Sequence, residues 1–105
     1  MKREQIRVGL LGVGTVGRGI LELLRMNSKT VEGRLGAPIV MERIVARSPE
    51  KARASMVPMD RLSFDPNDVI NNPDIDIVVE VMGGIEPAYD LVRRAIENGK
   101  HVVTA

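Results

Sequence analysis

Three glycines at the spacing G-x-G-x-x-G follow an apolar run near the start of the chain and could hold a phosphate group. They are Gly12, Gly14 and Gly17. The first permits a tight turn, the second lets backbone approach a pyrophosphate without an intervening Cβ, and the third lets a helix pack closely on a strand. The N–H groups of Thr15 and Val16 would then donate to the ligand from the helix N-terminus. The alternative is a turn that only serves helix packing.

A second candidate contact is Arg47 followed by Ser48, at the end of another apolar run. An acidic residue there would accept hydrogen bonds from the ribose of NAD, whereas a guanidinium pairs with the 2′-phosphate of NADP and a serine can donate to it. We therefore expect NADP to be preferred over NAD. The interval from Gly17 is 47 − 17 = 30 residues, longer than the usual 20 or so, and the polar stretch 27–38 accounts for the excess. Alternatively, Arg47 is one of several solvated charges, with Arg43, Lys51 and Arg53.

The third candidate loop is Met82 with Gly83 and Gly84, where backbone could approach the nicotinamide ribose or simply turn from strand to helix. Glu80 stands in an apolar run, so we interpret it as a structural hydrogen-bonding residue and not as a base. His101, the one histidine, begins a strand and is also interpreted as structural. No residues match a catalytic triad, a metal site or a pair of carboxylates in a cleft, and we predict no catalytic and no metal-binding residues. The predicted cofactor-binding residues are Gly12, Val13, Gly14, Thr15, Val16, Gly17, Arg47, Ser48, Met82, Gly83 and Gly84.

Strands alternating with helices must position these loops. We expect strands from Ile6 to the glycine turn and over 39–46, 62–64, 75–82 and 101–104, and helices over 15–26, 50–55, 66–70 and 87–97. The segment 28–35 is either a helix with Val31 and Leu35 buried or a loop. The last helix should bury one face, formed by Ala88, Leu91, Val92, Ala95 and Ile96. This order predicts an α/β fold with a doubly wound, Rossmann-type, mostly parallel sheet in a single domain over 1–105.

Composition excludes several other classes of protein. The 105 residues contain no cysteine, so disulfides and thiolate metal sites are excluded. The net charge is +1 and Phe64 and Tyr89 are the only aromatic residues, which argues against nucleic acid as a partner. Apolar runs are too short for a membrane span. We expect a cytoplasmic protein.

Three blocks of sequence, 8–17, 74–88 and 98–105, resemble the amino-terminal nucleotide-binding domain of homoserine dehydrogenase. The block Asp-Ile-Asp-Ile-Val-Val-Glu-Val-Met-Gly-Gly-Ile-Glu-Pro-Ala over 74–88 is the most specific of them. Sugar oxidoreductases of the glucose-fructose type share the Gly-Lys-His-Val of 99–102, but they continue toward Glu-Lys-Pro. The Val-Thr-Ala of 103–105 looks instead like the start of the Thr-Ala-Asn-Lys ending of homoserine dehydrogenase.

The resemblance implies a parent enzyme that interconverts L-homoserine and L-aspartate 4-semialdehyde by hydride transfer with NAD(P), on the route to threonine, methionine and isoleucine. It also implies a homo-oligomeric full-length enzyme. The chain ends before the Asn-Lys of the family motif. We therefore expect a truncated domain that binds cofactor but does not turn over. The alternatives are a free-standing NADP(H)-sensing module and a methyl-donor-binding domain, which would want an acidic residue in place of Arg47.

Overall fold

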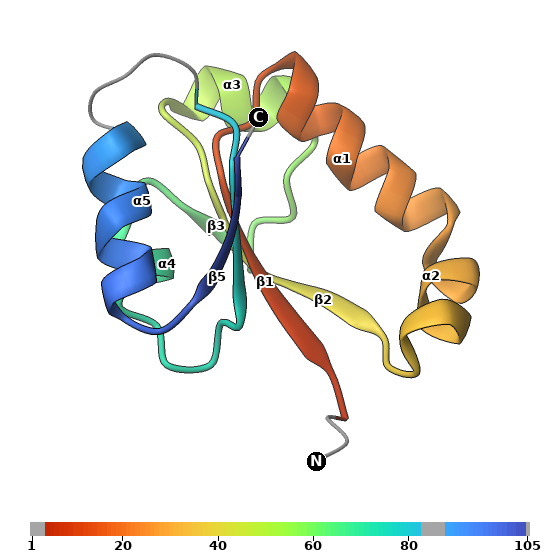
Figure 1. The fold of residues 1–105 in the computed structure, drawn as a ribbon. Coiled ribbons are helices and arrows are strands. Elements are labelled where there is room, and N and C mark those ends of the chain that lie inside the picture. Colours follow the sequence, from red (N-terminus) through yellow and green to blue (C-terminus); the bar gives the residue numbers. More distant parts are fainter. Residues whose placement is uncertain (1–3, 83–87, 105) are drawn as a thin grey trace.

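A five-stranded sheet forms the centre of the molecule in the computed structural model, which describes residues 4–82 and 88–104 (Figure 1). The strand order is β3-β2-β1-β4-β5. Every strand pair within it is parallel, so the predicted mostly parallel sheet is confirmed. The strands are β1 (Ile6–Leu11), β2 (Ile39–Val45), β3 (Leu62–Ser63), β4 (Ile77–Glu80) and β5 (His101–Thr104).

Helices lie on both faces of the sheet, as the predicted doubly wound fold requires (Figure 1). One face carries α1 (Thr15–Met26) and α2 (Ser28–Leu35), and the other carries α4 (Asn67–Ile70) and α5 (Ala88–Glu97). The short α3 (Pro49–Ala54) lies at the carboxyl ends of the strands, at the top of Figure 1, where α1 also begins. The helices α1 and α3, which follow β1 and β2, therefore both begin at the carboxyl edge of the sheet.

Two hydrophobic clusters separate the sheet from its helices. Neighbouring residues of β1 point to opposite faces, so Leu10 and Leu11, both fully buried, belong to different clusters. Leu11 packs in the cluster that includes Leu91 and Ala95 of α5. Leu10 packs in the cluster that includes Ala52 of α3. The carboxyl end of β1 is thus held from both sides directly below the glycine turn.

Gly9 is a close-packing position that sequence analysis missed. A Cβ on Gly9 would lie 2.5 Å from Cγ1 of Val69 and 3.0 Å from Cδ1 of Ile75. Both partners are buried, so a Cβ on Gly9 would force Val69 of α4 and its neighbours to shift away from β1. A glycine inside an apolar strand is a known sign of such an approach.

Several element boundaries and buried positions differ from expectation. The segment 28–35 is a helix, which ends at Gly36 with a φ of 77°, but its Leu35 is 53% exposed and the predicted burial of Leu35 is wrong. Ile96 is 59% exposed, so its predicted burial is also wrong. Leu91 and Ala95, one helical turn apart, carry the contact of α5 with the sheet, and Ile96 lies at the margin of that stripe. β4 is shorter than the predicted 75–82.

The amino edge of the sheet is closed by side chains that follow α5. Nζ of Lys100 donates to the carbonyl oxygens of Asn72, at 2.5 Å, and Ile75, at 2.9 Å. Nδ2 of Asn98 donates to the carbonyl oxygen of Ile70 at 2.8 Å. Burial lowers the pKa of the Lys100 ammonium from its ordinary value, against the opposing effect of nearby carboxylates.

A membrane-spanning helix must be long and apolar, and no helix in the described part of the chain meets both conditions.

Candidate functional site

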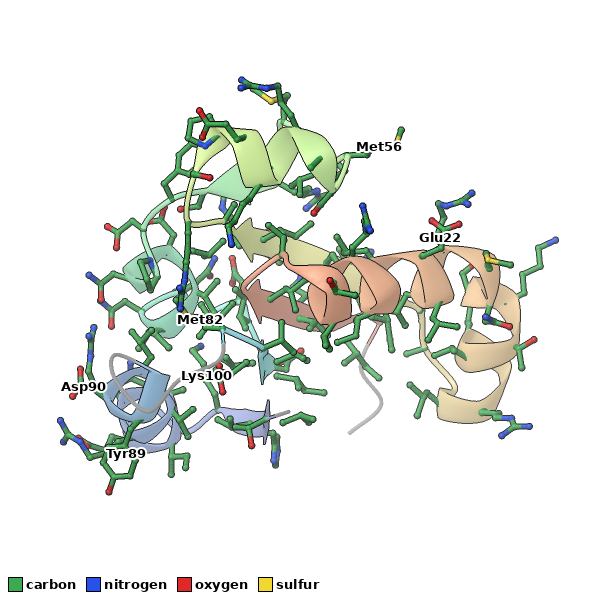
Figure 2. All side chains as sticks on the ribbon, turned by 90° about the horizontal axis from the view of Figure 1, so that it is seen from above. Glu22, Met56, Met82, Tyr89, Asp90 and Lys100 are labelled. Carbon is green, nitrogen blue, oxygen red and sulfur yellow. The ribbon has the colours of Figure 1, made fainter. Side chains whose placement is uncertain are left out.

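The carboxyl edge of the sheet carries a hollow of about 70 Å³ between the predicted loops. Figure 2 looks down on this edge, with Met82 between the sheet and α5. Enclosed pockets for small molecules measure roughly 300–1,000 Å³, so this hollow can cradle part of a ligand but not enclose a dinucleotide. Its lining residues are Gly12, Val13, Gly14, Arg47, Lys51, Val81 and Met82.

Gly12 and Gly17 build the turn between β1 and α1. Gly12 has a φ of 107°, and a Cβ there would lie 3.2 Å from the backbone of Met82. A Cβ on Gly17 would lie 2.4 Å from the carbonyl oxygen of Gly12. Both glycines are therefore required by backbone packing, which agrees with the tight turn and the close helix predicted for them.

Gly14 has a different environment, because a Cβ there would meet nothing within 4 Å. It is the N-cap of α1 and provides no side-chain cap, and the first turn of that helix contains no acidic residue. A helix N-terminus of this kind offers N–H donors and a favourable potential to an anion. The space beside Gly14 leaves room for a phosphate at the helix N-terminus, so the residues present fit a dinucleotide.

The two valines of the turn differ in exposure. Val13 is 4% exposed and packs in the core, while its carbonyl oxygen accepts a hydrogen bond of 2.8 Å from Oγ of Ser55. Val13 therefore supports the turn from below. The side chain of Val16 is 55% exposed, and Thr15 is also exposed.

Arg47 reaches across the end of β1. Its Nη2 donates to the carbonyl oxygen of Met82 at 3.0 Å. Because β2 and β4 flank β1, this bond joins the ends of two strands that are not neighbours. The Met82 N–H in turn donates to Oε2 of Glu80 at 2.6 Å. Glu80 is 6% exposed, so its predicted role as a structural hydrogen-bonding residue is confirmed.

Ser48 caps α3 with its side chain. Its Oγ accepts a hydrogen bond of 3.2 Å from the backbone N–H of Lys51, and Pro49 occupies the first helical position. Serine at the N-cap and proline next to it are the preferred way to begin a helix. Since Oγ acts here as an acceptor, this bond does not use the hydroxyl hydrogen that was expected to meet a phosphate.

Other residues singled out from the sequence do not join this hollow. His101 is exposed at the start of β5, at the opposite edge of the sheet. Gly83 and Gly84 lie outside the described residues. No group of three or more potential metal ligands occurs in the described ranges. A larger polar hollow of about 440 Å³ is lined by Arg43 and by residues of 67–72, and it contains no residue of the three candidate loops.

Comparisons with known proteins agree with this geometry. Residues 12–105 match the family model described as homoserine dehydrogenase, NAD binding domain. The chain is 46% identical over 102 residues to a homoserine dehydrogenase of Methylobacillus glycogenes, which covers 97% of the chain and 25% of that relative. The crystal structure of a homoserine dehydrogenase from Thiobacillus denitrificans superposes with a TM-score of 0.89 at 50% identity, over 95% of this chain and 23% of that one.

A more distant likeness concerns the fold alone. Levoglucosan dehydrogenase, solved in complex with NADH and levoglucosan, superposes with a TM-score of 0.73 at 24% identity, over 95% of this chain and 27% of that one. The chain spans about a quarter of the length of the curated relatives it matches.

Proposed function

The chain belongs to the homoserine dehydrogenase family, in which it corresponds to the NAD-binding domain, and we propose that it binds NADP in preference to NAD. The observation that carries the proposal is the presence of Arg47 in the same hollow as Gly14, which has open space beside the uncapped N-terminus of α1. A capped helix or a filled turn would leave no room and no donors for a phosphate.

Each part of the hollow has a proposed role. The backbone of 12–17 binds the pyrophosphate, with Thr15 and Val16 at the start of the helix. The Arg47 guanidinium pairs with the 2′-phosphate, and the hydroxyl of Ser48 donates to it while Oγ still caps α3. Arg47 uses one donor on Met82, and a guanidinium has five N–H donors. Met82, Gly83 and Gly84 approach the nicotinamide ribose.

For the whole protein we propose the family's reaction, the interconversion of L-homoserine and L-aspartate 4-semialdehyde, in a cytoplasmic homo-oligomer. The nicotinamide, when bound, supplies the hydride acceptor. The residues described here bind and orient the cofactor. None of the side chains lining the hollow is a base positioned to take a proton from a substrate alcohol. We therefore propose that this chain alone, taken as a domain over 1–105, binds cofactor without turnover.

Calorimetric titration of the chain with NADP and with NAD tests the proposed binding. We expect tighter binding of NADP, by about tenfold or more, because a charge-assisted hydrogen bond contributes roughly 1.5–3 kcal/mol before solvent screening. Arg47→Ala should bring the two affinities together. Equal affinities in the parent chain would contradict the preference, and no binding of either would contradict the site.

A second measurement addresses the activity of the chain by itself. NADPH absorbance is followed after mixing the chain with saturating NADP and excess homoserine, beside a complete homoserine dehydrogenase. We expect no turnover by the chain, since proximity and base catalysis each contribute several kcal/mol and need groups absent from this hollow. Rates comparable to those of the complete enzyme would overturn this proposal.

A further inference from the structure

Among the described residues that line the hollow, Lys51 is the one charged residue outside the three candidate loops. It lies in α3, four residues after Arg47, and it lines the same hollow as Arg47 and Gly14. From the sequence, Lys51 was expected to be one of the solvated charges. Its place beside the phosphate turn separates it from Arg53 of the same helix, which does not line the hollow.

The charge of Lys51 is available to a ligand. Within the described residues its ammonium forms no ion pair, whereas Arg53 lies 4.0 Å from the Glu50 carboxylate. The backbone of Lys51 is fixed, because its N–H donates to Oγ of Ser48 at 3.2 Å. Lys51 therefore has a fixed backbone and carries its charge on a long side chain with rotatable bonds.

Arg47 is partly engaged by another group. Its guanidinium donates to the carbonyl oxygen of Met82 at 3.0 Å, across the end of β1. Lys51 belongs to α3, the helix that follows β2. The seven lining residues include these two cations and no carboxylate. A hollow with two cations and no acid among its lining residues favours a dianionic group over a sugar hydroxyl.

We propose that Lys51 is a second specificity-determining residue for NADP, which pairs with the 2′-phosphate together with Arg47. The inference rests on the proposed function and adds a residue to it. Lysine suits this role as a compact charge with three rotatable donors, which can follow a phosphate where a planar guanidinium is held by another bond.

The experiment measures the affinities of NADP and NAD for the parent chain and for Lys51→Gln, with Arg53→Gln as the matched control. Both substitutions remove one positive charge from α3, but only Lys51 lines the hollow. Lys51→Gln should weaken NADP binding by about three- to tenfold and leave NAD within about twofold, the range expected for an exposed charge pair. Arg53→Gln should change neither affinity by more than about twofold, and Lys51→Arg should retain the preference.

Four outcomes would overturn the inference. An equal loss for NADP and NAD would assign Lys51 to the pyrophosphate. An equal effect of Arg53→Gln would assign it to the general charge of α3. An unchanged preference in Lys51→Gln, with the preference lost in Arg47→Ala, would refute Lys51 alone and leave the proposed function standing. A parent chain that binds neither dinucleotide would refute both. Circular dichroism of each variant confirms that the fold is intact.

Discussion

Two helices begin at the same edge of the sheet, and their N-termini are built in opposite ways. α3 is closed by its own chain: Ser48 caps it, Pro49 occupies its first position and Glu50 lies in its first turn. α1 begins at Gly14, with no side-chain cap and no acidic residue in the first turn. The closed terminus satisfies the backbone donors of a structural helix, and the open terminus leaves them for an anion. The contrast supports the proposal that the N-terminus of α1, and not the backbone donors of α3, binds the pyrophosphate.

The same contrast recurs between Gly14, the N-cap of α1, and Gly17 within it. Gly17 is required because its Cβ would collide with the carbonyl oxygen of Gly12, whereas a Cβ on Gly14 would meet nothing within 4 Å. Gly17 is therefore needed for the fold, and Gly14 is proposed to serve binding. Substitutions can separate these roles.

The largest expected effect is that of Gly17→Ala on stability. A Cβ at 2.4 Å from backbone oxygen cannot be relieved by a rotamer change, so α1 must move away from β1. We expect a loss of about 3 kcal/mol in the free energy of unfolding, measured by urea denaturation. Gly19→Ala is the control in the same helix, since nothing lies within 4 Å of its Cβ. The control should gain about 0.5–1 kcal/mol from helix propensity. Similar stabilities for the two variants would refute the packing role of Gly17.

The second-largest effect is expected from Gly14→Asp, which would give α1 a side-chain N-cap like that of α3. The carboxylate would cap the helix and fill the cradle with negative charge, so stability and affinity should move in opposite directions. We expect the free energy of unfolding to rise by about 0.5 kcal/mol and the affinity for NADP to fall by about 100-fold or more. Gly14→Asn caps without a charge and separates the steric effect from the electrostatic one. An unchanged NADP affinity in Gly14→Asp would contradict the proposed binding of the pyrophosphate at this helix N-terminus.

The smallest effect is expected from Ser48→Ala, which opens the N-terminus of α3. The Lys51 N–H loses its acceptor, and loss of such a cap costs about 1 kcal/mol in thermal or urea unfolding. Because Ser48 is also proposed to donate to the 2′-phosphate, NADP affinity should fall by a few-fold while NAD affinity stays constant. Ser48→Asp keeps the cap but repels the phosphate, so it should restore stability and not NADP affinity. If Ser48→Ala leaves the free energy of unfolding unchanged, the Ser48 cap does not stabilise α3, and the difference drawn between the N-termini of α1 and α3 is refuted.

Much of the fold follows from local patterns. The alternation of apolar strands and capped helices predicted the parallel sheet, and the glycine spacing predicted the turn at Gly12 and the close helix at Gly17. The ends of two elements differ from the predicted ends where a side chain accepts a hydrogen bond from a backbone N–H. β4 ends at Glu80, whose carboxylate takes the N–H of Met82. The helix expected after Asp65 begins one residue late, with Oδ1 of Asp65 accepting from the N–H of Asn67 at 2.9 Å.

Burial on helix surfaces was less predictable, because periodicity shows which residues share a face but not how wide the covered part is. Leu91 and Ala95 are covered by the sheet, while Ile96 of the same apolar face is largely exposed. Leu35 was assigned to a buried pair and is exposed for the same reason. How many residues of a helix face are buried depends on the elements that pack against it, and a local sequence pattern carries no information about those elements.

The sequence by itself determined the class of fold, the phosphate turn and the family likeness, because these depend on residue types a few positions apart. Tertiary structure alone decided which distant groups meet. Strand order sets β2 and β4 on either side of β1, and so brings Arg47 to the carbonyl oxygen of Met82, 35 residues away. The packing of α3 brings Lys51 to the same hollow as Gly14, and the packing of α4 brings Val69 so close to Gly9 that a Cβ there would force a shift. Such contacts arise only when the sheet assembles, because no spacing along the chain encodes the order of its strands.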